Sequence, residues 1–345
     1  MNRKLKGVGV GAGYFSHYQY EAWQRIPEVE MVGVCNRSVD KAREIAKMYG
    51  IPATYGVEDF RTMLEKEKPD FVDIITPPST HFELCRLAVQ CGVDIICQKP
   101  LAPTWPETLQ LAEVIRSSQV RFMVHENWRW QPWYREMKRL LAEDVLGRFF
   151  HLTMQTRIGD GWREDAYLAR QPFFRDYPRL YIFETGVHFL DAVRFLFGEV
   201  ATIYARIARR NPVIKGEDCA LLVCEFVNGG TAILDANRYN ETEAANPRYT
   251  FGRIRLDGSK GHLEMDEEAV MRIKSLGQPA RVHDYQPSRH GFSGDCVYAV
   301  QRHFVDCVLN DRPFESTIDD YLKSVRLVEA AYESAATNQV VRIAS

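Results

Sequence analysis

Apolar runs alternate with amphipathic segments along the N-terminal part of the chain. Runs such as "VEMVGVCN", "PDFVDIIT", "VDIICQKP" and "VRFMVHEN" predict buried strands. The segments between them, such as "VDKAREIAKMYG" and "HFELCRLAVQCG", have helical periodicity and end on glycine. Strands that are apolar on both faces and alternate with helices are typical of a doubly wound parallel sheet, because helices cover both of its faces. We therefore predict an α/β domain over residues 1–126.

The pattern changes after Asn127. A helix is expected over Trp133 to Leu141, and beyond Phe149 polar and apolar residues alternate in "RFFHLTMQTRI", "VATIYARIAR", "DCALLVCEF", "GTAILDANRY" and "GRIRLDG". The Asn-Gly pair in "CEFVNGGTAIL" is a strong hairpin signal. Residues 127–345 are thus predicted to form an α+β domain whose largely antiparallel sheet has one open face. Because a partner subunit usually buries such a face, we expect a homodimer or homotetramer.

Composition narrows the class of protein. The chain has 345 residues, of which 46% are hydrophobic and 26% charged, and a net charge of −2. The balanced charge argues against binding to nucleic acid or anionic membranes. No apolar run approaches the roughly 20 residues of a membrane span, and the N-terminus lacks a signal core, so we expect a cytoplasmic protein. The eight cysteines are scattered without a CxxC pair, and no metal site is predicted.

A glycine-rich turn follows the first predicted strand in "VGVGAGYFS". Gly11 allows a tight turn, and Gly13 lets the backbone approach a pyrophosphate at the start of the next helix, beside Tyr14 and Phe15. The motif has Ser16 in place of its last glycine. A glycine turn without a ligand is the alternative, but the strand–turn–helix context favours a Rossmann domain that binds NAD or NADP.

The end of the second predicted strand bears on the choice of cofactor. Many dinucleotide-binding domains have an acidic residue there for the ribose 2′-hydroxyl, but this chain has Asn36, Arg37 and Ser38. An arginine can bind a 2′-phosphate that a carboxylate would repel. The sequence therefore leans toward NADP, with a solvated Arg37 and the use of NAD as the alternative.

Two further motifs carry polar residues of catalytic type. Ligands of open parallel sheets bind beyond the carboxyl ends of the strands, and Lys99 follows one strand directly. In "ETGVHFLD", the i, i+4 spacing places Glu184 and His188 on one helix face. Histidine can accept a proton near neutral pH. A surface lysine and a buried structural histidine are the alternatives for these positions.

These motifs together resemble the Gfo/Idh/MocA family of NAD(P)-dependent sugar and polyol oxidoreductases. The resemblance spans nearly the whole chain and rests on the glycine turn, "TPPSTH", "QKP", "ENWRW", "ETGVHFLD", "DGSKGHLEM" and "RLVEAAYESA". The chain departs from the family pattern at Gln98, where glutamate is common, and at Glu184, where aspartate is common. Within the family, "QKPLAPT", "HENWRWQPWYR" and "NPVIKGED" resemble the D-apiose dehydrogenase branch.

The resemblance implies oxidation of a sugar or polyol hydroxyl, with hydride transfer to nicotinamide, by Lys99, His188 and Glu184. It also implies that Gln98, Lys99 and the segment of Thr76, Pro77 and His81 lie at the cofactor, although His81 is more typical of a structural histidine. The expected substrate contacts are Asn127, Trp128 and Arg129, followed by Arg157, Trp162 and Arg163 in the long loop from Arg157 to Arg175.

Two other functions fit the same motifs. A glycosidase or sugar-isomerising enzyme of the same family retains its cofactor and uses the same lysine and histidine. A regulator that binds the cofactor without catalysis is the second alternative, although it has no need of a proton acceptor.

Overall fold

The computed structural model describes residues 3–343 and divides into two units. One comprises Met1–Asn127 and Val297–Lys323, and the other comprises Trp128–Cys296 and Ser324–Ser345. The sequence predicted two contiguous ranges, whereas helix α8 (Cys296–Leu309) contributes to the first unit. There, Phe304 packs against the rings of Trp23 and Phe71. Helical periodicity indicates that α8 has an apolar face, but it does not identify what that face covers.

The first unit contains the predicted parallel sheet, in the order β3-β2-β1-β4-β5-β6. The order changes direction between β1 and β4, and ligands of such sheets bind at the carboxyl ends beside this point. The strands are β1 (Leu5–Val10), β2 (Val29–Asn36), β3 (Ala53–Gly56), β4 (Phe71–Ile74), β5 (Asp94–Gln98) and β6 (Phe122–His125).

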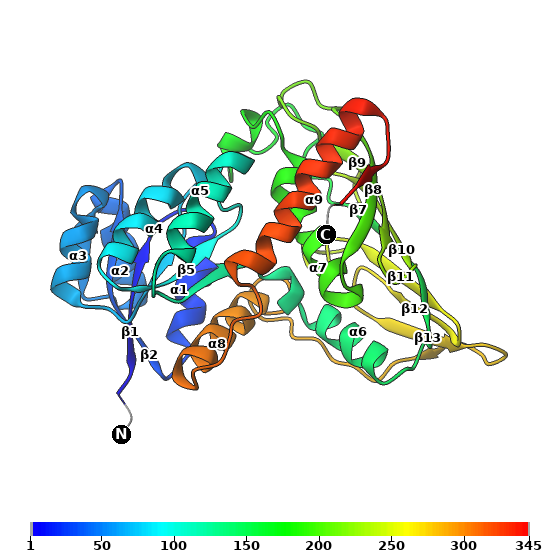
Figure 1. Cartoon of the computed structure of the whole chain (residues 1–345), viewed down its shortest axis with the longest axis horizontal. Coiled ribbons are helices and arrows are strands. Elements are labelled where there is room, and N and C mark those ends of the chain that lie inside the picture. Colours follow the sequence, from blue (N-terminus) through cyan, green and yellow to red (C-terminus); the bar gives the residue numbers. More distant parts are fainter. Residues whose placement is uncertain (1–2, 344–345) are drawn as a thin grey trace. The chain divides into compact units, whose positions relative to one another are not determined.

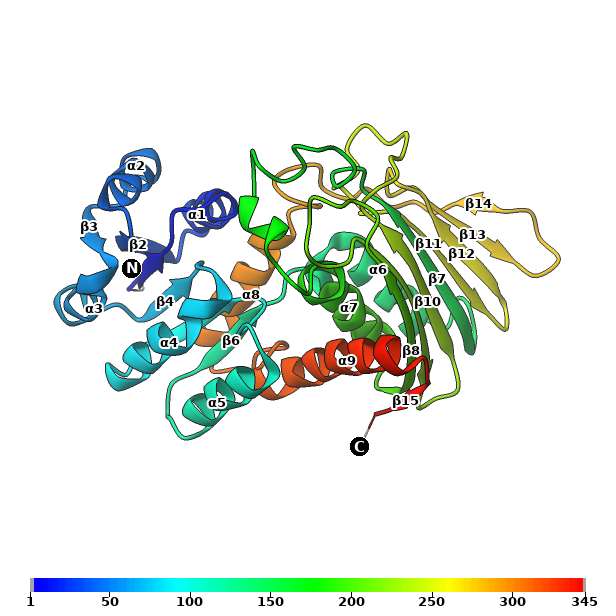
Figure 2. The same cartoon turned by 90° about the horizontal axis from the view of Figure 1, so that it is seen from above.

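Helices cover both faces of this sheet. Figure 2 shows α1 and α2 on one face and α4 and α5 on the other. Ser38 and Thr104 are the side-chain N-caps of α2 and α5, and α2 ends at Gly50, whose φ is 64°. The helices are α1 (Ser16–Gln24), α2 (Val39–Tyr49), α3 (Phe60–Glu67), α4 (His81–Gln90) and α5 (Trp105–Arg116), with short turns η1 (Val57–Asp59) and η2 (Pro78–Thr80).

The second unit contains the predicted, mostly antiparallel sheet, in the order β14-β13-β12-β11-β7-β10-β9-β8-β15. The Asn-Gly hairpin is confirmed, since β9 and β10 pair antiparallel on either side of it, while β10 and β7 run parallel. The strands are β7 (Phe149–Arg157), β8 (Val200–Ala208), β9 (Cys219–Phe226), β10 (Thr231–Asn237), β11 (Arg253–Gly258), β12 (Gly261–Met265), β13 (Met271–Ser275), β14 (Arg281–Val282) and β15 (Val341–Arg342).

Alternating burial gives the nine-stranded sheet two different faces. Leu152, Met154 and Leu234 are buried, whereas Leu221 on the other face is 41% exposed. Figures 1 and 2 show helix α7 along one face of this sheet. The helices of the unit are α6 (Pro132–Ala142), α7 (Val187–Phe197) and the part of α9 (Ile318–Thr337) from Ser324 onward, with η3 (Trp128–Trp130), η4 (Pro172–Arg175) and the π-helix η5 (Tyr181–Gly186). Within residues 3–343, no helix is both long and apolar enough to cross a bilayer.

Candidate active site

The glycine turn between β1 and α1 has the geometry of a phosphate-binding turn. Gly11 has a φ of 121°, and a Cβ there would lie 2.7 Å from the carbonyl oxygen of Ile75, so glycine is required. A Cβ at Gly13 would meet no atom within 4 Å, which leaves open space beside the backbone. The buried Ser16 donates from Oγ to the carbonyl of Gly13 at 2.7 Å. Together with the N-terminus of α1, Gly13 therefore fits a pyrophosphate.

Of the other predicted cofactor-binding residues near this turn, some contact neighbouring side chains and some are exposed. Tyr14 is 37% exposed and its hydroxyl lies 3.1 Å from that of Tyr18, against which Phe15 also packs. At the end of β2, Asn36 donates to the carbonyl of Ser38 at 3.1 Å. The side chain of Ser38 caps α2 and is thereby occupied. The exposed, cationic Arg37 is the candidate at this strand end for binding a 2′-phosphate.

The segment after β4 is tied to the domain interior by His81. Thr76 is half-buried and Pro77 exposed, and the Thr76 hydroxyl accepts from Thr80 Oγ1 at 2.7 Å. The His81 ring is fully buried between the carbonyl oxygens of Thr76, at 2.8 Å from Nε2, and Leu101, at 3.1 Å from Nδ1. This placement supports the structural role for His81, which fixes the segment that Thr76 presents.

His81 should make the stability of the protein pH-dependent. Burial lowers the pKa of His81 to about 4, although its backbone hydrogen bonds act to raise it. Because the unfolded chain binds the proton more readily, this stabilisation is present above about pH 6.5 and is lost as the pH falls through about 4. Between about pH 6.5 and 4, we expect the free energy of unfolding of the native protein to fall by about 3 kcal/mol more than that of His81→Gln.

The measurement is urea unfolding of the cofactor-free protein at several pH values. His17→Gln is the control, because it removes an exposed imidazole and leaves the buried ring of His81 in place. A His81→Gln profile with the same slope as the native protein contradicts the assignment.

Lys99 lies directly beyond β5 and is half-buried. The side chain of Gln98 points into the domain, where Nε2 donates to Gln19 Oε1 at 2.8 Å. Its Oε1 accepts from the backbone N–H of Lys99 at 3.2 Å. Gln98 thus contacts the protein interior and the backbone of the candidate catalytic lysine.

His188 and Glu184 lie in the second unit at a break in helical geometry. Glu184 belongs to the π-helix η5 and His188 to α7, which follows it directly, so the helical geometry changes between them. Their position on one helix face stays a prediction. π-Helical turns often occur at functional sites. The imidazole of His188 stacks on the indole of Trp128, with centroids 4.9 Å apart and planes inclined by 4°. Trp128 therefore fixes the plane of the candidate proton acceptor.

Sequence reasoning missed a buried ionic cluster beside Glu184. Arg238, which follows β10, donates to both oxygens of Asp160 at 2.9 and 2.7 Å and lies 3.5 Å from Glu184 Oε2. Burial acts to raise the pKa of Asp160, but Arg238 and Arg170 outweigh it and hold that pKa below its usual value. The ring of Tyr167 lies 5.0 Å from the Arg238 guanidinium. The signal available in the sequence was an arginine at a strand end, in "DANRY".

Two predicted substrate contacts are arginines that form ion pairs of their own. Arg129 is buried and forms a bidentate ion pair with Asp191 of α7, at 2.8 and 2.5 Å, which indicates a structural role. Arg157 pairs with Asp235 at 2.7 Å. Its neighbour Thr156 is buried and lies 3.0 Å from the hydroxyl of Tyr181, so strand alternation directs Arg157 to the opposite face of the sheet.

The remaining predicted contacts are Trp162, Arg163 and Asn127. Trp162 is 40% exposed and donates to Glu241 at 2.9 Å, and Arg163 lies over its ring at 4.9 Å. Asn127 is buried at the end of the first unit's initial segment, and Lys99 belongs to the same unit. Since His188 belongs to the other unit, the convergence of Lys99 and His188 on one substrate stays a prediction.

The fold and the glycine turn define a protein of the dinucleotide-binding class. Residues 6–126 match the model of the oxidoreductase family with an NAD-binding Rossmann fold, and residues 134–264 match the GFO/IDH/MocA C-terminal domain. This chain belongs to the Gfo/Idh/MocA family.

Several relatives resemble the chain over nearly its whole length. The D-apiose dehydrogenase of Paraburkholderia graminis is 31% identical over 99% of this chain and 91% of the relative. That of Rhizobium rhizogenes is 30% identical over 99% and 98%. An oxidoreductase from Agrobacterium radiobacter, solved in complex with NAD+, L-tartaric acid and magnesium, has a TM-score of 0.90 and 30% identity, with 98% of each chain covered.

Proposed function

We propose that this chain is an NAD(P)-dependent dehydrogenase that oxidises a hydroxyl group of a sugar or polyol. The observation that carries the proposal is the placement of Lys99 at the carboxyl end of β5, on the sheet edge that also presents the glycine turn. The D-apiose dehydrogenases that resemble the chain over its length support the same reaction class. The bound dinucleotide supplies the hydride acceptor.

The side chains of the protein supply proton transfer and orientation. His188 is a candidate base for the hydroxyl proton, and its stacking on Trp128 restricts the direction in which the imidazole accepts that proton. Lys99 can hydrogen-bond the same hydroxyl and stabilise a developing alkoxide, or act as the base itself. Glu184, paired with Arg238, is the candidate for orienting the substrate's other hydroxyls.

Two classes of substrate fit this arrangement. D-apiose is favoured by the two relatives of that activity. A hydroxy acid is the second candidate, because Arg170 and Arg238 lie in the cluster beside Glu184 and a related oxidoreductase binds L-tartaric acid. Both classes offer several hydroxyl groups to hydrogen-bond donors and acceptors.

A panel of aldoses, polyols and hydroxy acids, tested with NAD and with NADP, examines the proposal through the absorbance of the reduced cofactor. We expect turnover with at least one branched or linear sugar, and a kcat/KM ratio that favours NADP because of Arg37. A strong preference for NAD contradicts the role of Arg37. Tightly retained cofactor without net reduction favours a glycosidase or isomerising enzyme, and dinucleotide binding without turnover favours a regulator.

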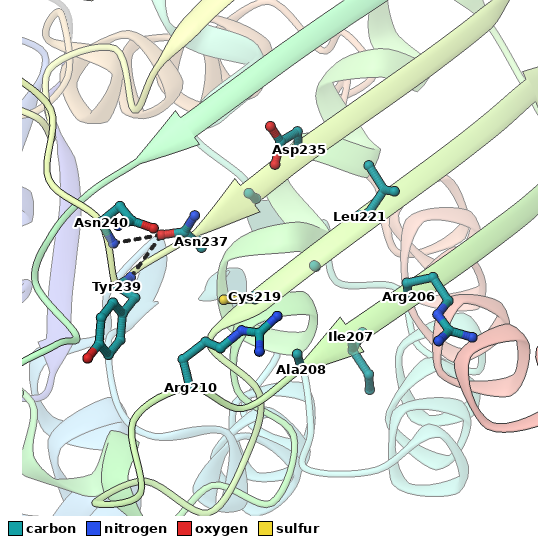
Figure 3. Close-up of a pocket in the computed structure, with 12 residues that line it drawn as sticks. Arg206, Ile207, Ala208, Arg210, Cys219, Leu221, Asp235, Asn237, Tyr239 and Asn240 are labelled. Carbon is teal, nitrogen blue, oxygen red and sulfur yellow. Dashed lines mark hydrogen bonds between the residues drawn. The ribbon is translucent and has the colours of Figure 1, made fainter.

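We further propose that two copies of the chain associate through the open face of the nine-stranded sheet. This unit has a depression with a volume of about 740 Å³. It is lined by both apolar and charged side chains, which are drawn in Figure 3. Arg206 and Arg210 lie there with Asp235 and the exposed Ile207 and Leu221, so that a second copy offers complementary partners. We expect light scattering to give at least twice the mass of one chain, and Leu221→Asp to reduce it.

A further inference from the structure

A row of buried polar side chains runs through the first unit from β4 to Lys99. Asp73 on β4 is fully buried, and it accepts hydrogen bonds from Gln19 Nε2, at 2.9 Å from each oxygen, and from Trp23 Nε1, at 2.7 Å. Gln19 is also fully buried, and its Oε1 accepts from Gln98 Nε2 at 2.8 Å. The Oε1 of Gln98 then accepts from the backbone N–H of Lys99 at 3.2 Å. Four residues are thereby connected in one hydrogen-bonded row.

The two ends of this row dictate the orientation of both amides within it. A carboxylate only accepts hydrogen bonds, so Gln19 must direct Nε2 toward Asp73 and Oε1 toward Gln98. A backbone N–H only donates, so Gln98 must direct Oε1 toward Lys99 and Nε2 toward Gln19. Reversing either amide brings two donors or two acceptors face to face and leaves a buried group unpaired. The ionised form of Asp73 and the backbone N–H of Lys99 therefore set the direction of every hydrogen bond in the row.

We propose that Asp73, Gln19 and Gln98 are positioning residues for Lys99, an inference that rests on the proposed catalytic role of that lysine. Asp73 anchors the row at the sheet centre, and Gln98 transmits this constraint to the backbone that carries the ammonium group. Burial raises the pKa of Asp73 to about 7, although the hydrogen bonds from Trp23 and Gln19 act to lower it. Burying a charged Asp73 therefore costs free energy. An asparagine at this position would avoid that cost, so a structural role alone does not explain the aspartate.

The row can be reversed by moving the carboxylate from position 73 to position 98. In Gln98→Glu alone, a carboxylate faces the Oε1 of Gln19. In Asp73→Asn alone, the introduced Nδ2 faces another donor, either Gln19 Nε2 or Trp23 Nε1. In the double variant, the amide introduced at position 73 donates to Gln19, which turns over and donates to the carboxylate at position 98. His125 Nδ1, 3.1 Å from Gln98 Nε2, can become a donor by relocating its proton.

The experiment is a double-mutant cycle with two readouts: the Tm of the cofactor-free protein, and kcat and KM of the holoenzyme. We expect each single substitution to lower the Tm by several degrees and kcat by about tenfold, with KM less affected, and the double variant to recover most of both losses. The control pair combines Gln98→Glu with Asp94→Asn, because Asp94 accepts from the Arg121 backbone, outside the row. The losses of that pair should add.

Additive losses in the double variant overturn the inference. A double variant whose Tm and kcat stay as low as those of Gln98→Glu also overturns it, because nothing is recovered. If the Tm values are coupled but kcat is normal in both single variants, the row has only a structural role, and the inference is also overturned. Normal turnover by Lys99→Ala identifies a failure of the proposed function itself, because coupling in Tm does not depend on the role of Lys99.

Discussion

Replacement of Lys99 by alanine is expected to lower kcat by about two orders of magnitude or more. The half-buried residue lies at the carboxyl end of β5, where open parallel sheets bind their ligands, and its ammonium is the candidate donor to the reacting hydroxyl. The variant removes both a positive charge and a possible proton acceptor. Steady-state kcat and KM, measured with a substrate identified from the panel, report the effect.

Lys99→Arg separates the two roles of the lysine. Arginine retains the charge but stays protonated, so it can stabilise an alkoxide and cannot act as the base. Partial activity in this variant, well above that of Lys99→Ala, supports electrostatic stabilisation, and equal loss in both supports proton transfer. Lys47→Ala is the control, because Lys47 is exposed in the last turn of α2. Near-normal turnover by Lys99→Ala removes the residue from the mechanism.

Replacement of His188 is expected to lower kcat on a similar scale, because the candidate proton acceptor is lost. Alanine would also leave a gap beside Trp128, since the two rings stack at 4.9 Å. His188→Phe is therefore the sharper variant: it retains a planar ring against the indole but has no nitrogen to accept a proton. We expect both variants to lose kcat by about a hundredfold or more, and His188→Phe to retain a Tm close to that of the native protein.

The comparison of these variants distinguishes chemistry from packing. Loss of activity in His188→Phe without loss of Tm supports proton transfer by the imidazole. Normal kcat in His188→Phe assigns His188 to packing and contradicts the mechanism. His151→Gln is the control, since His151 lies on β7 and contacts Thr231 and Thr153 away from Trp128.

Local sequence patterns predicted the features that depend on neighbouring residues. The parallel strands, the glycine turn and the Asn-Gly hairpin follow from periodicity and turn chemistry, which act over a few residues. The placement of Lys99 beyond β5 follows in the same way. Family resemblance added the pairing of this lysine with His188, which no local pattern connects.

Long-range pairing determined the features that the sequence did not predict. Arg129 and Asp191 are far apart in the chain but form a buried ion pair, so the arginine has a structural partner. Arg157 is the last residue of β7, so strand alternation determines the face to which its side chain points. The sequence pattern predicts a loop that begins at Arg157, so that face could not be predicted from it. The cluster of Asp160 and Arg238 joins a loop to a strand end, and its geometry exists only in the folded unit.

The return of α8 to the first unit affects how the protein is made. A ribosome releases Trp23 and Phe71 early, but Phe304, which packs against both rings, emerges only after the whole intervening unit. During synthesis, these aromatic surfaces of the N-terminal segment therefore stay uncovered until α8 has been made. A gene fragment that stops at Asn127 omits that covering helix altogether, and its product should aggregate unless residues 297–323 are supplied.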